Sequence, residues 1–189
     1  KVDTLIVNAS ECEPYITSDT RTMLDKSDDI WGGIDALRKY LEVKRFIFGI
    51  EKNKPEAITK MQELASKSEG VEVKVLPSSY PQGGEKVLVY HATKRIIGNG
   101  QLPIDAGCIV LNCTTVAAIG SYLKTGMPLT EKTVTVDGGA VKEPKNVIAP
   151  IGTPLREMFD FCGGFKEEPS KVLYGGPMMG ITVPDLDVP

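Results

Sequence analysis

Short apolar runs alternate with longer amphipathic segments along the first part of the chain. Four runs, at residues 4–8, 45–50, 71–76 and 108–111, are rich in β-branched, aromatic and other apolar side chains, which is typical of buried strands. Helical patterns separate these runs. The order therefore predicts an α/β fold with a mostly parallel sheet flanked by helices.

The segments between the runs carry apolar residues at helical spacing. We expect one helix to follow Ser27, which would act as its N-cap, and a second to begin with Pro55 at its first helical position. The apolar stripe of the first contains Ile30, Ile34, Leu37 and Leu41. Two further helices are predicted at residues 85–95 and 114–124.

The pattern changes from Thr130 onward. A strand with a Gly-Gly turn and a second extended segment precede a helix start at Thr153-Pro154, a Gly163-Gly164 stop and a strand at 171–174. We therefore predict two domains, an α/β domain at 1–127 and a small β-rich module at 128–189.

The composition excludes several classes of protein. Lys and Arg number 22 against 25 acids, giving a net charge of -3, and no basic block is present, so a nucleic-acid partner is not expected. No apolar run approaches the ~20 residues of a membrane helix. The four cysteines form no Cys-x-x-Cys pair, which argues against a zinc ribbon or an iron–sulfur cluster held by this segment. We interpret them as cytosolic thiols.

The two ends suggest that the chain is an internal piece of a longer polypeptide. Lys1 stands where a methionine would begin a protein, a strand pattern follows almost at once, and the sequence ends in the extended stretch VPDLDVP.

Three polar loops follow predicted strands and are candidates for chemistry. They are the first loop (residues 8–15, NASECEPY), the second loop (79–86, SYPQGGEK) and the third loop (110–115, VLNCTT). Ligands of open α/β sheets bind beyond the carboxyl ends of strands, and a Gly-Gly pair before a helix presents free N–H groups.

Each loop also has an ordinary structural interpretation. A Gly-Gly pair can be only a turn, Asn112 and Thr114 can be only a helix cap, and the acids of the first loop can be merely solvated. Walker and G-x-G-x-x-G motifs are absent, so a standard nucleotide-binding fold is not supported. His91, the single histidine, falls within a predicted helix and is interpreted as a packing or surface residue.

The order and spacing of several motifs resemble a known family. NASECEPY, YPQGGEK, VLNCTT, GTPLREMFDFCGG and GGPMMG are similar to the C subunits of Rnf electron transport complexes, which are membrane-associated ferredoxin:NAD oxidoreductases. The chain is more distantly similar to the NADH-oxidising FMN flavoprotein subunit of respiratory complex I. The likeness extends along nearly the whole chain.

The resemblance implies an FMN site and an NADH site. Asn8, Ser10 and Glu11 match positions around the flavin, Glu85 would be a carboxylate shared by flavin and nicotinamide with Tyr80 nearby, and the third loop would surround the FMN phosphate and ribityl chain. The implied FMN contacts are Asn8, Ser10, Glu11, Tyr80, Gly83, Gly84, Glu85, Asn112, Cys113 and Thr115. The implied NADH contacts are Glu13, Glu85 and Lys86.

The chain departs from the complex I pattern at three of these places. Ser10 replaces an aspartate near the flavin and keeps only a hydrogen-bonding oxygen. Gly84 and Lys86 replace a glutamate and a threonine of the second loop, which leaves the placement of the nicotinamide open. A flavin carries the hydride chemistry itself, so no acid, base or nucleophile is needed from the protein.

The family also has parts that lie outside this sequence. A glycine-rich loop would lie upstream, and two 4Fe-4S clusters would lie on cysteine runs downstream. We therefore expect this piece to be isolated without cofactor and to be inactive alone.

The resemblance further implies a second domain and a cellular setting. Residues 128–189 resemble the soluble-ligand-binding β-grasp (SLBB) module, interpreted here as a spacer. The parent subunit would be a peripheral translocase subunit on the cytoplasmic face of the membrane, with other Rnf subunits, including membrane subunits, as partners. Two alternatives stay open: a cobalamin reductase of bacterial microcompartments, and a non-catalytic scaffold or cobalamin-binding module.

Overall fold

The computed structural model describes all 189 residues, which divide into two compact units. Residues 1–12 and 19–127 form the first unit, and residues 13–18 and 128–189 form the second. Residues 13–18, which we expected in the first domain, thus cluster with the second unit. None of the helices has the length and hydropathy that crossing a bilayer requires.

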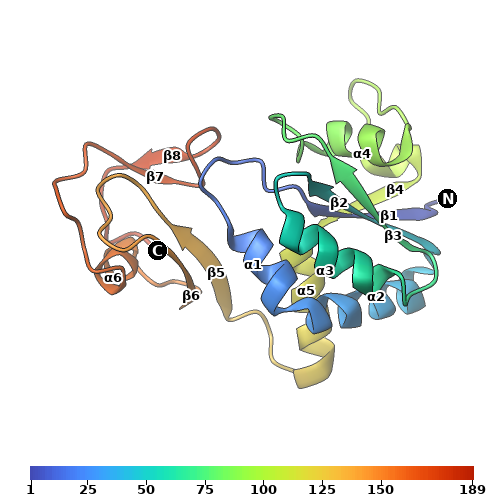
Figure 1. The fold of residues 1–189 in the computed structure, drawn as a ribbon, viewed down its shortest axis with the longest axis horizontal. Helices are drawn as coiled ribbons and strands as arrows, with labels where there is room; N and C mark the ends of the chain where they lie inside the picture. The colour runs from blue at the N-terminus through green and yellow to red at the C-terminus, as the bar shows by residue number, and fades with distance from the viewer. The chain divides into compact units, whose positions relative to one another are not determined.

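A four-stranded parallel sheet organises the first unit (Figure 1). Its elements are β1 (Thr4–Ala9), α1 (Ser18–Asp25), α2 (Ser27–Leu41), β2 (Arg45–Glu51), α3 (Pro55–Ala65), β3 (Val71–Leu76), α4 (Glu85–Thr93), the 3-10 helix η1 (Pro103–Ala106), β4 (Cys108–Asn112) and α5 (Cys113–Thr125). The strand order is β3-β2-β1-β4. The predicted α/β fold class is confirmed.

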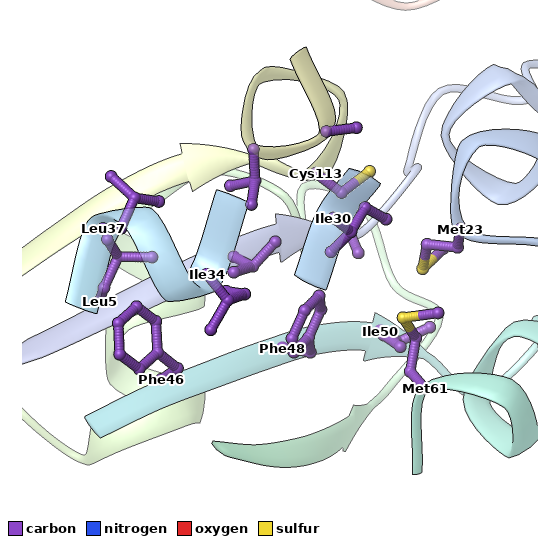
Figure 2. Packing of buried hydrophobic residues seen from close by; sticks show 14 of the residues in the cluster. Leu5, Met23, Ile30, Ile34, Leu37, Phe46, Phe48, Ile50, Met61 and Cys113 are labelled. Carbon is purple, nitrogen blue, oxygen red and sulfur yellow. The ribbon is translucent and has the colours of Figure 1, made fainter. Parts of the chain in front are cut away.

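The central strands are buried on both faces because their side chains alternate between two cores. Leu5, Phe46 and Phe48 face one core, which contains residues of α1, α2, α3 and α5 (Figure 2). Ile6 and Ile47 belong to the other core, which α4 covers with Leu88 and Val89. Parallel sheets normally bury both faces in this way.

Helices α2 and α5 approach each other closely through glycines. A Cβ built on Gly33 would lie 2.1 Å from the carbonyl oxygen of Val116, and one on Gly120 would lie 1.9 Å from that of Asp29. Larger residues would force the two backbones apart. This contact places α5, and hence the loop before it, against the sheet.

Some details of the predicted elements are wrong. Ser27 is the first helical residue of α2 rather than its N-cap; Lys26 precedes the helix and makes no side-chain cap. The predicted helix at 85–95 ends at Thr93, because Lys94 adopts a left-handed conformation with φ of 65°. Neither α1 nor η1 was expected.

The second unit has two antiparallel strand pairs and one helix. Its elements are β5 (Glu131–Val136), β6 (Lys145–Pro150), α6 (Leu155–Phe161), β7 (Val172–Tyr174) and β8 (Ile181–Val183). β5 pairs with β6, and β7 pairs with β8. Its core consists of Val136, Val141, Val147, Ala149, Leu155, Met158 and Cys162.

Candidate cofactor site

The three candidate loops follow β1, β3 and β4, whose carboxyl ends lie at the same edge of the sheet. β1 pairs in parallel with both β2 and β4, with Asn8 opposite Gly49 on one side and Asn112 on the other. β1, β2 and β3 progress in one direction across the sheet, and β4 then returns to the far side of β1. This reversal is a topological switch point, where open α/β sheets bind ligands.

Asn8 joins the first loop to the second. Its side-chain Nδ2 donates to the carbonyl oxygen of Gly83 at 3.0 Å, and its Oδ1 accepts from the backbone N–H of Ser10 at 3.1 Å. The hydroxyl of Ser10, another predicted FMN contact, donates to the carbonyl oxygen of Gly49 at 3.2 Å. Both polar side chains are thus used to shape the edge of the sheet.

Gly83 allows the second loop to lie against the first. A Cβ built at this position would lie 2.8 Å from the Ser10 carbonyl oxygen and 3.3 Å from the Cys12 sulfur. Any other residue would push the two loops apart. The glycine therefore has a steric role beyond that of a turn.

The carboxylate of Glu11 is buried and fully engaged. It accepts hydrogen bonds from the backbone N–H groups of Asp19 (2.7 Å) and Thr20 (3.3 Å), from the Thr20 hydroxyl (2.7 Å) and from Lys54 Nζ (3.2 Å). Its side chain is 3% exposed, and that of Lys54 is 13% exposed. The two N–H groups lie in the first turn of α1, where a negative charge is favoured.

Asp19 connects this arrangement to the third loop. Its carboxylate accepts from Asn112 Nδ2 at 2.8 Å and from the Thr114 hydroxyl at 2.9 Å. Asn112 also caps α5, since its Oδ1 accepts from the Thr114 N–H at 2.7 Å. The predicted cap is confirmed, whereas sequence reasoning missed Asp19, which no local motif singles out.

Glu51 is a second acid that sequence reasoning missed. It ends β2 at the same edge and is 3% exposed. Burial raises its pKa, the nearby Lys54 ammonium opposes this shift, and the Glu11 charge adds to it. The sequence could have indicated this residue, because a glutamate at the end of the buried run RFIFGI is unusual.

The N-terminus of α4 has no side-chain cap. Gly84 is the N-cap and supplies no side chain, so the first N–H groups of this helix have no intrahelical acceptor. The exposed carboxylate of Glu85 has no hydrogen bond or ion pair within the chain. Lys86 Nζ donates to the Gly98 carbonyl oxygen at 2.7 Å, and Tyr80 is 43% exposed.

Cys113 and Thr115 differ in accessibility. The Cys113 thiol is fully buried, and burial together with the negative charges of Asp19 and Glu11 raises its pKa well above the ordinary value. It therefore stays protonated. Thr115 is exposed on α5 and its hydroxyl has no intrachain hydrogen bond.

A buried pair supports the second loop from the other face of the sheet. Gln82 is 0% exposed and its Nε2 lies 2.8 Å from Nδ1 of His91, which fixes the loop against α4. The Gln82 Oε1 atom has no hydrogen-bond partner. His91 is thus a packing residue, as the sequence indicated.

Glu13 lies in the second unit and does not share the surroundings of Glu11. Its carboxylate accepts from the backbone N–H groups of Met178 and Met179, each at 2.9 Å. The predicted NADH contact through Glu13 stays a prediction.

These geometries fit a flavin in chemical terms. The edge offers open N–H groups on α4, one unengaged carboxylate at Glu85 and an exposed hydroxyl at Thr115. These are the donors and acceptors that a ring with carbonyl oxygens and N–H groups, and a phosphate, can use.

Comparison with known families decides the relationship. The family described as "Nuo51 FMN-binding domain" matches residues 1–121, which is more than half of the chain. The chain belongs to the Nuo51 FMN-binding family. A second description, "SLBB domain", matches residues 133–182.

Two curated relatives of this Nuo51-family chain align over all 189 residues. The C subunit of the proton-translocating ferredoxin:NAD(+) oxidoreductase complex of Clostridium ljungdahlii is 47% identical, and that of the Na(+)-translocating complex of Acetobacterium woodii is 39% identical. The chain spans 41% and 43% of their lengths. The predicted resemblance to these C subunits is confirmed.

Solved structures share the fold. Two structures of an NAD+-reducing [NiFe]-hydrogenase, in the H2-reduced and air-oxidized states, align with TM-scores of 0.68 and 0.71 at 19% and 17% identity. They cover 83% and 91% of this chain, and the chain covers 32% and 34% of theirs.

Proposed function

We propose that this chain is the FMN- and NADH-binding part of the C subunit of a ferredoxin:NAD oxidoreductase complex. The observation that carries the proposal is the meeting of the first and second loops through Asn8 and Gly83 at the same sheet edge as Asn112. Family membership and the two relatives named as C subunits support it. Other subunits of the complex, including membrane subunits, would be its partners at the cytoplasmic face of the membrane.

FMN, when bound, supplies the hydride chemistry between NADH and the iron–sulfur clusters expected elsewhere on the subunit. The residues of this chain would hold FMN and orient the nicotinamide of NADH. The N–H groups at the start of α4 would bind acceptor atoms of the cofactor, with Gly83 keeping the second loop against the first. Thr115 would add a hydroxyl near the start of α5.

Glu85 would orient the nicotinamide. Of the three predicted contacts Glu11, Glu13 and Glu85, only Glu85 has a carboxylate without an intrachain partner. A free carboxylate at a helix N-terminus is also favoured by the helix dipole. The other two acids would act indirectly, by fixing the backbone around the site.

Glu85→Gln in the full-length subunit tests this function. We expect NADH-dependent dye reduction to fall by about tenfold, or about 1.4 kcal/mol in the barrier, with the FMN content unchanged. Glu63→Gln, at an exposed position of α3, is the matched control and should retain full turnover. Unchanged turnover in Glu85→Gln would refute the role of this carboxylate, and a full-length subunit without FMN would refute the proposed function.

A further inference from the structure

A buried group of three charged side chains lies beside the candidate site, and the proposed function uses only one of them, Glu11. Glu51 ends β2, and three residues later Lys54 precedes α3, with its backbone N–H donating to the Glu51 carbonyl oxygen at 3.1 Å. From this tight turn Lys54 Nζ reaches Glu11 Oε2 at 3.2 Å. The turn therefore brings Lys54 to the acid of the first loop, with the buried Glu51 at its start.

We propose that Lys54 is a positioning residue that holds the Glu11 part of the first loop in place, and that Glu51 takes up a proton, so that the buried group of Glu11, Glu51 and Lys54 carries no net charge. The consequence for FMN rests on the proposed function. The charge arrangement itself does not.

The charges explain why a proton is needed. With both carboxylates ionised, the group carries two negative charges and one positive charge in a place where Glu11 and Glu51 are 8% and 3% exposed. Burying an uncompensated charge is strongly unfavourable, whereas a hydrogen-bonded pair is tolerated. Glu11 is surrounded by four donors, including Lys54, so a negative charge there is compensated within the group.

Glu51 is the acid that accepts the proton. No hydrogen bond within the chain reaches its carboxylate, and the charged groups that act on it are Lys54 from the turn before α3 and Glu11 from the first loop. Burial and the Glu11 charge both favour the neutral form, and they outweigh the opposing effect of Lys54, so the pKa of Glu51 is raised.

The position of Glu11 is transmitted to the third loop. Glu11 binds the N–H groups of Asp19 and Thr20, and the Asp19 carboxylate binds Asn112 and Thr114. A shift of Glu11 would therefore move the start of α1 and alter the support of Asn112. Lys54 thus acts on Asn112 through Glu11 and Asp19.

The first test is the pH dependence of thermal unfolding. A group with a raised folded-state pKa gives stability that is present below its unfolded pKa and is lost as pH rises through the folded value. Glu51→Gln mimics the protonated acid. Its melting temperature should equal that of the wild type near about pH 4 and exceed it by about 2 to 4 °C at about pH 8.

Glu63→Gln is the matched control for this test. The pKa of Glu63 is lowered by its bond to Lys67, so this variant should show no gain, or a small loss, as pH rises. A gain for Glu51→Gln that is equal at all pH values, or no gain, would overturn the proton-uptake role.

The second test measures whether Glu11 still holds the backbone N–H groups of Asp19 and Thr20. In Lys54→Met we expect amide hydrogen exchange at Asp19 and Thr20 to become at least about tenfold faster, because their acceptor loses its fixed place. The N–H of Phe46, a fully buried residue of β2 that donates to the Gly70 carbonyl oxygen at 2.8 Å, serves as the internal reference for global unfolding. Unchanged protection of Asp19 and Thr20 would overturn the positioning role. Neither test needs FMN or NADH, so failure here is distinguishable from failure of the proposed function.

Discussion

The side chain of Asn8 donates to the backbone carbonyl of Gly83, 75 positions away, at 3.0 Å. One asparagine at the end of β1 thereby fixes the approach of the second loop. The same side chain also accepts from Ser10, so it shapes both loops at once. This double role makes Asn8 the residue on which the geometry of the edge depends.

Asn8→Ala should destabilise the first unit by about 1–3 kcal/mol, because the Gly83 carbonyl and the Ser10 N–H lose their partner in a partly buried place. Chemical denaturation measures the free energy of unfolding. Asn53→Ala, at an exposed turn position, should change it by less than about 0.5 kcal/mol. Equal stability of the two variants would contradict the role of Asn8.

Two adjacent glycines of α2 should respond in opposite ways to alanine. Gly33→Ala would place a methyl group 2.1 Å from the Val116 carbonyl oxygen and should cost about 1–3 kcal/mol by separating α2 from α5. Gly32→Ala meets nothing closer than 3.5 Å and should stabilise the helix by up to about 1 kcal/mol. Thermal unfolding distinguishes them, and a Gly33→Ala variant as stable as Gly32→Ala would show that the close crossing is absent.

Cysteine reactivity should differ sharply within the candidate site. Cys113 is fully buried with a pKa well above the ordinary value, whereas Cys12 is half-buried. Since the thiolate is the reactive form, iodoacetamide at about pH 8 should label Cys12 and leave Cys113 unlabelled in the folded chain. Peptide mass spectrometry checks this, with all four cysteines reacting in denaturant as the control. Rapid labelling of Cys113 in the folded chain would contradict the packing described for α5.

The contact between Glu13 and the β7–β8 turn should be visible by hydrogen exchange. Glu13→Ala removes the acceptor of the Met178 and Met179 N–H groups, so both amides should exchange faster. Glu167→Ala, at an exposed position of the second unit, should leave them unchanged. If Met178 and Met179 keep their protection in Glu13→Ala, other groups must hold this turn.

The sheet and the cap of α5 were predictable because they depend on local patterns. The runs that form β1, β2, β3 and β4 have the composition of buried parallel strands, and Asn112 precedes a helix in a motif that favours capping. The roles of Asp19 and Lys54 were not predictable, because each is defined by partners distant in the chain. The assignment of residues 13–18 to the second unit likewise depends on long-range bonds, such as that from the Thr17 N–H to the Thr135 hydroxyl.

Hydrogen exchange of the full-length subunit with and without FMN tests the central claim most directly. If the loops after β1, β3 and β4 enclose the cofactor, FMN should slow exchange in peptides covering residues 8–12, 82–86 and 112–115 together, while peptides of the far end of α3 remain unchanged. FMN that binds while these three segments keep their exchange rates would contradict the account.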